Sequence, residues 1–186
     1  LFTLVLVRPL AEFTVREIVQ MGRAPHLGRL QPEGPADRAA IAEALAVTAT
    51  EHLAERPVTE LSGGELQRVT IARALAQQAP IMLLDEPAAF LDINHQQQIF
   101  NLLARLNATD QRSILCISHD LNLAAEYAHR LVLIAAGQVV CAGTPEEVLT
   151  AELIRLVYGC EVEVDRSPSG RPRISLLARA QAGERR

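Results

Sequence analysis

The sequence has 186 residues, of which 49% are hydrophobic and 22% are charged, and its formal net charge is −4. This composition is typical of a globular chain with a sizeable core and excludes an intrinsically disordered protein. The basic residues are scattered, which argues against a clustered positive face, so we expect no nucleic-acid partner. All 18 residues in the Lys and Arg count are arginines, so the sequence contains no lysine.

The cysteines and the hydropathy indicate the compartment. Cys116, Cys141 and Cys160 lack the spacing of metal ligands. Cys116 and Cys141 lie in apolar runs, and we expect them to be buried thiols in a reducing cytosol, without a disulfide framework. No apolar run reaches the roughly 20 residues of a membrane span, so another chain would have to cross the bilayer in any membrane process. Because the sequence begins at Leu1 and enters an apolar segment at once, we interpret its start as lying inside a domain.

The first sixty residues are predicted to be mostly helical. An apolar run predicts a strand over residues 2–7, ended by Arg8-Pro9. Thr14 is followed three residues later by Glu17, the pattern of a capping box, which predicts a helix over 15–21. Prolines and glycines predict a loop over 23–35, apolar spacing predicts a helix over 36–50, and a short helix plus loop follows over 52–60.

Residues 61–87 hold the most informative pattern, LSGGELQRVTIARALAQQAPIMLLDEP. Ser62 precedes Gly63 and Gly64, whose missing Cβ atoms let a ligand approach the backbone, and the helix that follows directs its positive end to the same place. Residues 81–84 predict a buried strand that ends at Asp85 and Glu86. Ligands of open α/β sheets bind at that end of the strands, so we expect a phosphate site and a metal site here.

The remaining elements alternate between helices and strands. We expect a helix over 92–106 with the polar residues 95–98 on its solvated face, and a buried strand over 113–118 followed by His119 and Asp120. Further predictions are a helix over 122–128, a hairpin of residues 131–135 and 138–141, helices over 145–149 and 151–158 capped by Thr144 and Thr150, an edge strand over 161–164, and a solvated tail over 171–186.

This order of elements predicts an α/β fold with a mainly parallel sheet. We expect one domain over residues 1–186, with three parts. Residues 13–60 and the start of the next helix form an inserted all-helical subdomain, residues 78–143 form the core sheet, and residues 144–186 form small helices and a tail.

Each motif has an ordinary structural interpretation when it is taken alone. Ser62 and Asp92 fit helix N-caps, His119 fits a structural histidine, and Asp-Glu pairs follow many apolar strands. The order of the four motifs along the chain is far more specific than any one of them. LSGGE comes first, then LLDEP, then LD, and then a second apolar strand that ends in SHD.

On these residues the chain resembles the nucleotide-binding subunit of an ABC transporter, which has a P-loop NTPase-like fold. LSGGELQR is similar to the family's signature, IMLLDE to its Walker B, AAFLD to its D-loop and SHD to its H-loop. The segments FTVREIVQMGRAPH, DEPAAFLDINHQQQI and GTPEEVLTAELIRLVYG resemble a narrower group, the importers of iron–siderophore complexes, haem and cobalamin.

The resemblance implies a site for ATP and Mg²⁺ on this chain. Asp85 would help to hold Mg²⁺, Glu86 would be the catalytic base for ATP hydrolysis, and His119 would contact the γ-phosphate.

The resemblance also implies a contact with a second ATP. Ser62, Gly63 and Gly64 would bind the γ-phosphate of ATP held by the opposite subunit of a homodimer, and Gln67 would reach its ribose. Asp92 would link the two sites. Transmembrane permease subunits would be direct partners and a periplasmic or surface substrate-binding protein an indirect one, with the chain in the cytoplasm on the inner face of the membrane.

One departure from the family pattern concerns the phosphate loop. Walker A requires G-x-x-x-x-G-K-[ST], and this sequence has no lysine. We therefore expect an N-terminally truncated copy, without Walker A and the antiparallel β part, that binds MgATP poorly and does not hydrolyse it alone. Arg8-Pro9-Leu10 stands where the Q-loop glutamine is expected.

Two alternatives remain open. The chain is either the ATPase subunit of an iron-chelate or cobalamin importer, present here as an N-terminally truncated copy, or a non-catalytic remnant or pseudo-subunit that offers only its LSGGE face to a complete partner. A soluble ABC ATPase of DNA repair or translation is disfavoured, because such proteins carry long coiled coils or basic surfaces.

Overall fold

The computed structural model describes residues 13–28, 32–110 and 112–177, which form two compact units that divide after Ile117. The predicted strand over 2–7 and the Q-loop position at 8–10 lie outside the described residues. In chain order the first unit contains α1 (Val15–Gln20), the 3₁₀ helix η1 (Met21–His26), α2 (Pro35–Val47), the 3₁₀ helices η2 (Glu51–Leu53) and η3 (Val58–Glu60), α3 (Gly63–Ala76), β1 (Ile81–Asp85), α4 (Ile93–Asp110) and β2 (Ser113–Ile117).

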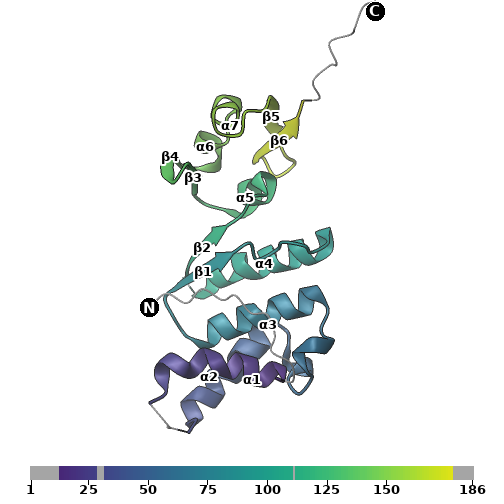
Figure 1. Ribbon diagram of the computed structural model, residues 1–186, viewed down its shortest axis with the longest axis vertical. Helices are drawn as coiled ribbons and strands as arrows, with labels where there is room; N and C mark the ends of the chain where they lie inside the picture. Colours follow the sequence, from purple (N-terminus) through teal and green to yellow (C-terminus); the bar gives the residue numbers. More distant parts are fainter. Residues whose placement is uncertain (1–12, 29–31, 111, 178–186) are drawn as a thin grey trace, which may run out of the picture. The chain divides into compact units, whose positions relative to one another are not determined.

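The helical part of the first unit is built around α3, against which α1 and α2 pack side by side (Figure 1). The predicted capping box at the start of α1 is confirmed: the Glu17 carboxylate accepts the Thr14 backbone N–H at 2.7 Å, and Thr14 Oγ1 accepts the Glu17 N–H at 3.3 Å. The predicted loop over 23–35 is wrong in its first residues, because η1 continues to His26. Tertiary contacts of Gly22 and Arg23 order this segment, and proline and glycine content does not reveal them.

Gly22 lies directly against the backbone of α3. A Cβ at this position would be 2.2 Å from the Arg73 carbonyl oxygen, and backbone cannot move aside as a side chain can. We therefore expect Gly22→Ala to lower the free energy of unfolding by about 2 kcal/mol in urea denaturation. The matched control is Gly34→Ala, whose Cβ would meet only Asp37 Oδ2 at 3.6 Å. Equal losses in the two variants would contradict this explanation.

One hydrophobic core joins the helices of the first unit to its strands. Val15, Val19, Val69, Ile71 and Ala72 are fully buried in it. From the remaining elements, β1 contributes Met82 and Leu84, and α4 contributes Ile99, Leu102, Leu103 and Leu106.

Strands β1 and β2 form a parallel pair, with Ile81 opposite Ser113 and Asp85 opposite Ile117. The prediction that both strands are buried is wrong for one face of the pair. Met82 and Leu84 are buried, whereas Ile81, Leu115 and Ile117 are 54%, 58% and 60% exposed. Successive side chains of a strand point to opposite faces, and among the described residues the core covers only one face.

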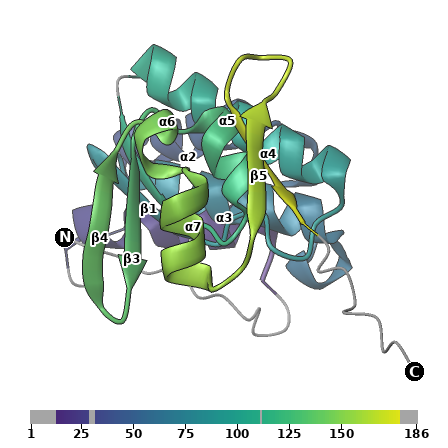
Figure 2. The same ribbon diagram turned by 90° about the horizontal axis from the view of Figure 1, so that it is seen from above.

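The second unit contains, in chain order, α5 (Leu121–Tyr127), β3 (Leu131–Ala135), β4 (Gln138–Gly143), α6 (Pro145–Val148), α7 (Ala151–Tyr158), β5 (Val162–Arg166) and β6 (Pro172–Leu176). Figure 2 shows α7 between the β3–β4 hairpin and β5, and a second core with Leu133, Ile154 and Val162 joins these elements. Ala136 and Gly137 have φ angles of 49° and 75° and form the predicted tight turn of the first hairpin. The Thr144 and Thr150 caps are also confirmed.

Strand β6 corrects the prediction of a solvated tail over 171–186. It pairs antiparallel with β5, and the Asn122 side chain accepts the Ile174 N–H at 2.8 Å and donates to the Ile174 carbonyl at 3.1 Å. Arg173 also pairs with Asp165 across the hairpin at 2.8 Å. These partners lie far away in sequence or on the facing strand, so local basicity could not reveal the strand. Residues 178–186 lie outside the described part.

The described residues therefore form a mixed α/β fold with a helical insertion, with one parallel strand pair and two antiparallel pairs. The predicted sheet region over 78–143 is spread over both units, and its boundaries stay a prediction. None of the helices in the described ranges has the length and hydropathy needed to cross a membrane.

Candidate functional site

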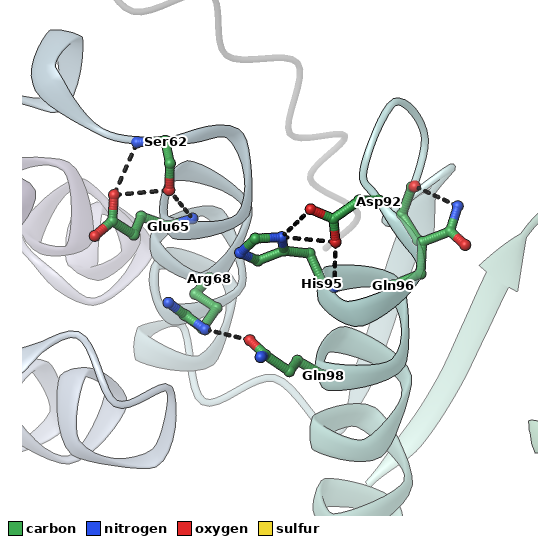
Figure 3. Close-up of polar contacts among 8 residues, drawn as sticks. Ser62, Glu65, Arg68, Asp92, His95, Gln96 and Gln98 are labelled. Carbon is green, nitrogen blue, oxygen red and sulfur yellow. Dashed lines mark hydrogen bonds and ion pairs between the residues drawn. The ribbon is translucent and has the colours of Figure 1, made fainter.

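The LSGGE turn begins α3 with a complete capping box. Ser62 donates its backbone N–H and its hydroxyl to the Glu65 carboxylate at 2.8 Å each, and Ser62 Oγ accepts the Glu65 N–H at 3.4 Å (Figure 3). The structure thus confirms the N-cap interpretation of Ser62. It also shows that both donors of Ser62 are directed to Glu65 within the chain.

The capping box makes the stability of the fold depend on pH in the acid range. The Ser62 backbone N–H, and then its hydroxyl, hold the pKa of Glu65 below its ordinary value of 4.5. A carboxyl group with a lowered folded pKa stabilises the fold above its ordinary pKa, and that contribution is lost as pH falls through the folded value. We expect Ser62→Ala to lower the unfolding free energy by about 1 kcal/mol near neutral pH. The loss should be smaller at about pH 3, in denaturation curves recorded at both pH values; a larger loss in acid would contradict this.

Gly63 and Gly64 follow as the first two residues of α3. Within the described part of the chain, neither backbone N–H has an acceptor, so both remain donors at the positive end of a 14-residue helix. The missing Cβ atoms also serve a contact inside the chain. A Cβ at Gly64 would lie 2.3 Å from Cδ2 of His95, and one at Gly63 would lie 3.4 Å from Cδ2 of Leu91. Gln67 lies half-buried one turn further along the helix.

Asp92 and His95 form a close pair at the start of α4. Asp92 Oδ1 accepts the His95 backbone N–H at 2.9 Å, which confirms the predicted helix-start contact. Nδ1 of His95 lies 2.9 Å from both carboxylate oxygens (Figure 3). The backbone N–H, and then the imidazole, lower the pKa of Asp92.

The prediction that residues 95–98 form a solvated face is therefore wrong for His95 and also for Gln96, which is half-buried. His95 lies three residues after Asp92, so its ring turns back toward that carboxylate. The ring also approaches Gly64 of α3. Gln98 is exposed but accepts a hydrogen bond from Arg68 of α3 at 2.8 Å.

Asp85 and Glu86 lie at the carboxyl end of the parallel pair. Asp85 is the last residue of β1 and is exposed, whereas Glu86 is half-buried and donates its N–H to the Ile117 carbonyl at 3.0 Å. Glu86 has a φ of 48°, a left-handed conformation that is uncommon for a non-glycine residue and that often accompanies functional sites. Burial, and then the negative charges of Glu86 and Asp85, raise the pKa of the Cys116 thiol to about 11.

These carboxylates fit the requirements of Mg²⁺ in part. Mg²⁺ takes oxygen ligands, keeps several waters and is usually bound through one or two carboxylates together with substrate phosphates. The structure offers two adjacent carboxylates, and the described residues contain no group of three or more His, Cys, Asp or Glu side chains arranged for a metal. Asp85 and Glu86 alone could therefore supply only part of the coordination of such an ion.

His119 is exposed and immediately precedes the N-cap of α5, where Asp120 Oδ1 accepts the N–H groups of Asn122 and Leu123. His119 belongs to the second unit, whereas all the other predicted site residues belong to the first. Sequence reasoning missed Leu91 and His95, which lie against Gly63 and Gly64, the signature glycines. The available signal was a histidine three residues after a helix-capping aspartate.

Comparison with known proteins matches residues 7–89 to the ABC transporter family. The cobalamin import ATP-binding protein BtuD of Halobacterium salinarum is 46% identical over 158 residues, which are 85% of this chain and 39% of that protein. The ferric enterobactin transport ATP-binding protein FepC of Escherichia coli is 40% identical over 169 residues, 90% of this chain and 62% of that protein. The chain thus spans between 39% and 62% of the length of these two relatives.

Solved structures agree with this match. A putative metal-chelate type ABC transporter in an inward-facing conformation superposes with a TM-score of 0.85 at 26% identity, covering 94% of this chain and 70% of that one. An ATP-binding cassette of an ABC transporter in its ADP conformation gives a TM-score of 0.71 at 26% identity, covering 82% and 65%. The fold is that of a P-loop NTPase cassette. The chain belongs to the ABC transporter family, and its relatives include iron-siderophore, haem and cobalamin import ATP-binding subunits.

Proposed function

We propose that this chain supplies the signature and Walker B parts of the ATP-hydrolysing subunit of an ABC importer for an iron chelate (siderophore or haem) or cobalamin. The observation that carries the proposal is a pair of polar features in one unit, each of a kind suited to a ligand. A capped helix begins with two glycine N–H groups that have no acceptor in the described chain, and two carboxylates end a parallel strand pair.

The LSGGE turn serves the nucleotide held by a partner subunit. The Gly63 and Gly64 N–H groups lie at a helix N-terminus, the preferred backbone site for a phosphate. Ser62 would join them by redirecting its hydroxyl from Glu65 to the γ-phosphate, Gln67 would approach the ribose, and Asp92 would link the two sites of the dimer.

The carboxylates serve the nucleotide of the chain itself. Asp85 would hold Mg²⁺ together with water and phosphate oxygens, and the ion supplies charge stabilisation for phosphoryl transfer. Glu86 would orient the attacking water and take its proton, and its half-buried position next to the strand end suits a general base. His119 would contact the γ-phosphate.

The partners follow from the relatives. A related cassette has been solved as a dimer bound to ADP and Pi, and a related protein forms part of an ABC transporter complex. By this likeness we infer a homodimer that associates with permease subunits on the inner face of the membrane, served indirectly by a periplasmic or surface substrate-binding protein.

Cellular uptake tests the proposal and identifies the cargo. Cells that lack the gene would be supplied in turn with a labelled ferric siderophore, haem and cobalamin, with and without a plasmid copy. We expect the plasmid copy to restore uptake of one cargo, and a plasmid with Asp85→Ala to fail. Equal uptake of all three compounds with and without the gene would contradict an importer.

A second function, a non-catalytic subunit that offers only its LSGGE face, is favoured by one observation. These 186 residues contain no lysine, so they cannot supply the P-loop lysine that pairs with the β- and γ-phosphates. We expect the isolated chain to show no ATP hydrolysis above a Glu86→Gln variant in a phosphate-release assay. Clear activity above that control would contradict this expectation.

A further inference from the structure

His95 has close neighbours on both α4 and α3, and the proposed ATP site gives it no role. Its Nδ1 lies 2.9 Å from both carboxylate oxygens of Asp92. An ionised carboxylate can only accept hydrogen bonds, so Nδ1 carries the proton. The other edge of the ring, with Cδ2 and Nε2, then faces α3 (Figure 3).

The ring edge fills the space that a side chain at position 64 would need. A Cβ on Gly64 would lie 2.3 Å from Cδ2, 2.9 Å from Cγ and 3.0 Å from Nε2 of His95. Leu91 approaches the neighbouring Gly63 in the same way, with Cδ2 3.4 Å from the Cβ position. Both signature glycines therefore face the segment that starts α4.

A second link joins the same two helices one turn further along. Arg68, four residues after Gly64, donates to Gln98, three residues after His95, at 2.8 Å. Helices α3 and α4 are thus connected at two successive turns, and the His95 contact lies at the end where the Gly63 and Gly64 N–H groups are.

We propose that His95 is a positioning residue: Asp92 holds its ring against Gly64, and this contact fixes the start of α3 so that the glycine N–H groups meet phosphate. The consequence for activity rests on the proposed ATP function of the LSGGE turn. Glycine at position 64 is then required by a contact within the chain as well as by any approach of a ligand.

The contact itself is tested by stability, without nucleotide. In the full chain, we expect Gly64→Ala to lower the melting temperature by about 5 °C, because the methyl group displaces the ring. In a His95→Ala background the same change should cost nothing or should stabilise, because alanine forms helices better than glycine. His52→Ala and Gly34→Ala are the matched controls. An equal loss from Gly64→Ala in both backgrounds would overturn the proposal.

The orientation of the ring has a spectroscopic signature. Neutral His95 should carry its proton on Nδ1 in ¹⁵N spectra of the imidazole, and Asp92→Ala should abolish that preference while leaving the signals of His52 unchanged. A neutral ring protonated on Nε2 in the wild-type chain would overturn the assigned geometry.

Activity separates the positioning role from the proposed function. In the complete transporter ATPase that contains this chain, Gly64→Ala should reduce turnover by about 10- to 100-fold. His95→Ala alone should also reduce turnover, because the start of α3 loses its support, so Gly64→Ala should cost less in a His95→Ala background. An active wild-type complex in which Gly64→Ala is equally damaging in both backgrounds would overturn the positioning role. A wild-type complex without ATPase activity would contradict the proposed function. The melting temperatures of the Gly64→Ala and His95→Ala variants would still test the contact between the two residues.

Discussion

Replacing Arg23 with methionine is expected to lower the free energy of unfolding by about 3–5 kcal/mol, because it breaks a buried ion pair from one side. Arg23 is only 5% exposed, and its Nε donates to Asp37 Oδ1 at 2.9 Å. Its Nη1 donates to the Ala76 carbonyl at 2.7 Å and to Gln78 Oε1 at 2.9 Å. The variant leaves the Asp37 charge and the last carbonyl of α3 without this partner. Urea denaturation of the full chain measures the loss.

The pair also has a defined charge state. The Gly34 backbone N–H, and then the Arg23 guanidinium, hold the pKa of Asp37 below its ordinary value, so the carboxyl group is ionised at neutral pH. The matched control is Arg16→Met, whose partner Glu55 lies at 2.8 Å but is 77% exposed, so that we expect a loss below about 1 kcal/mol. Similar losses for Arg23→Met and Arg16→Met would show that burial of the pair is unimportant. The double variant Arg23→Met with Asp37→Leu should recover part of the stability.

Replacing Glu86 with glutamine in the complete transporter ATPase is expected to reduce turnover by about 10²- to 10⁴-fold, the contribution of a general base. Glutamine has nearly the same shape but does not take a proton at neutral pH, so nucleotide binding should persist. Phosphate release measures turnover, and a fluorescent ATP analogue measures binding.

The control for this variant is Glu51→Gln, which removes an exposed carboxylate from η2. We expect its turnover to equal that of the wild type. If Glu86→Gln lost binding and turnover to the same degree, the carboxylate would act on the nucleotide or on Mg²⁺, and the assignment as base would be wrong. Full activity of Glu86→Gln would also show that the assignment as base is wrong.

Local patterns predicted the helices and their caps well, because a cap depends on residues three positions apart. Thr14 with Glu17 fixed the start of α1, and the N-cap interpretation of Ser62 placed the start of α3. Prediction failed where the partner lies far along the chain. The strand at Ile174 is held by Asn122, and the order of η1 depends on Arg23 and Asp37, so neither could be found from neighbouring residues.

The candidate site shows the same division. Motif order placed Ser62, Asp85 and Glu86 at a helix start and a strand end, where the structure has them. Their roles in ATP binding and hydrolysis stay predictions, as do those of His119 and Gln67. The contact between His95 and Gly64 was missed, because the two residues are 31 positions apart and nothing in either segment alone indicates that they meet.

The sequence by itself determined the family, the order of the motifs and the absence of lysine, because these depend only on which residues stand where. Tertiary structure alone decided which neighbours Gly22 and Gly64 pack against, which charges are buried and which strand faces are covered. The physical reason is that close packing and desolvation are set by segments distant in sequence, which meet only in the folded chain.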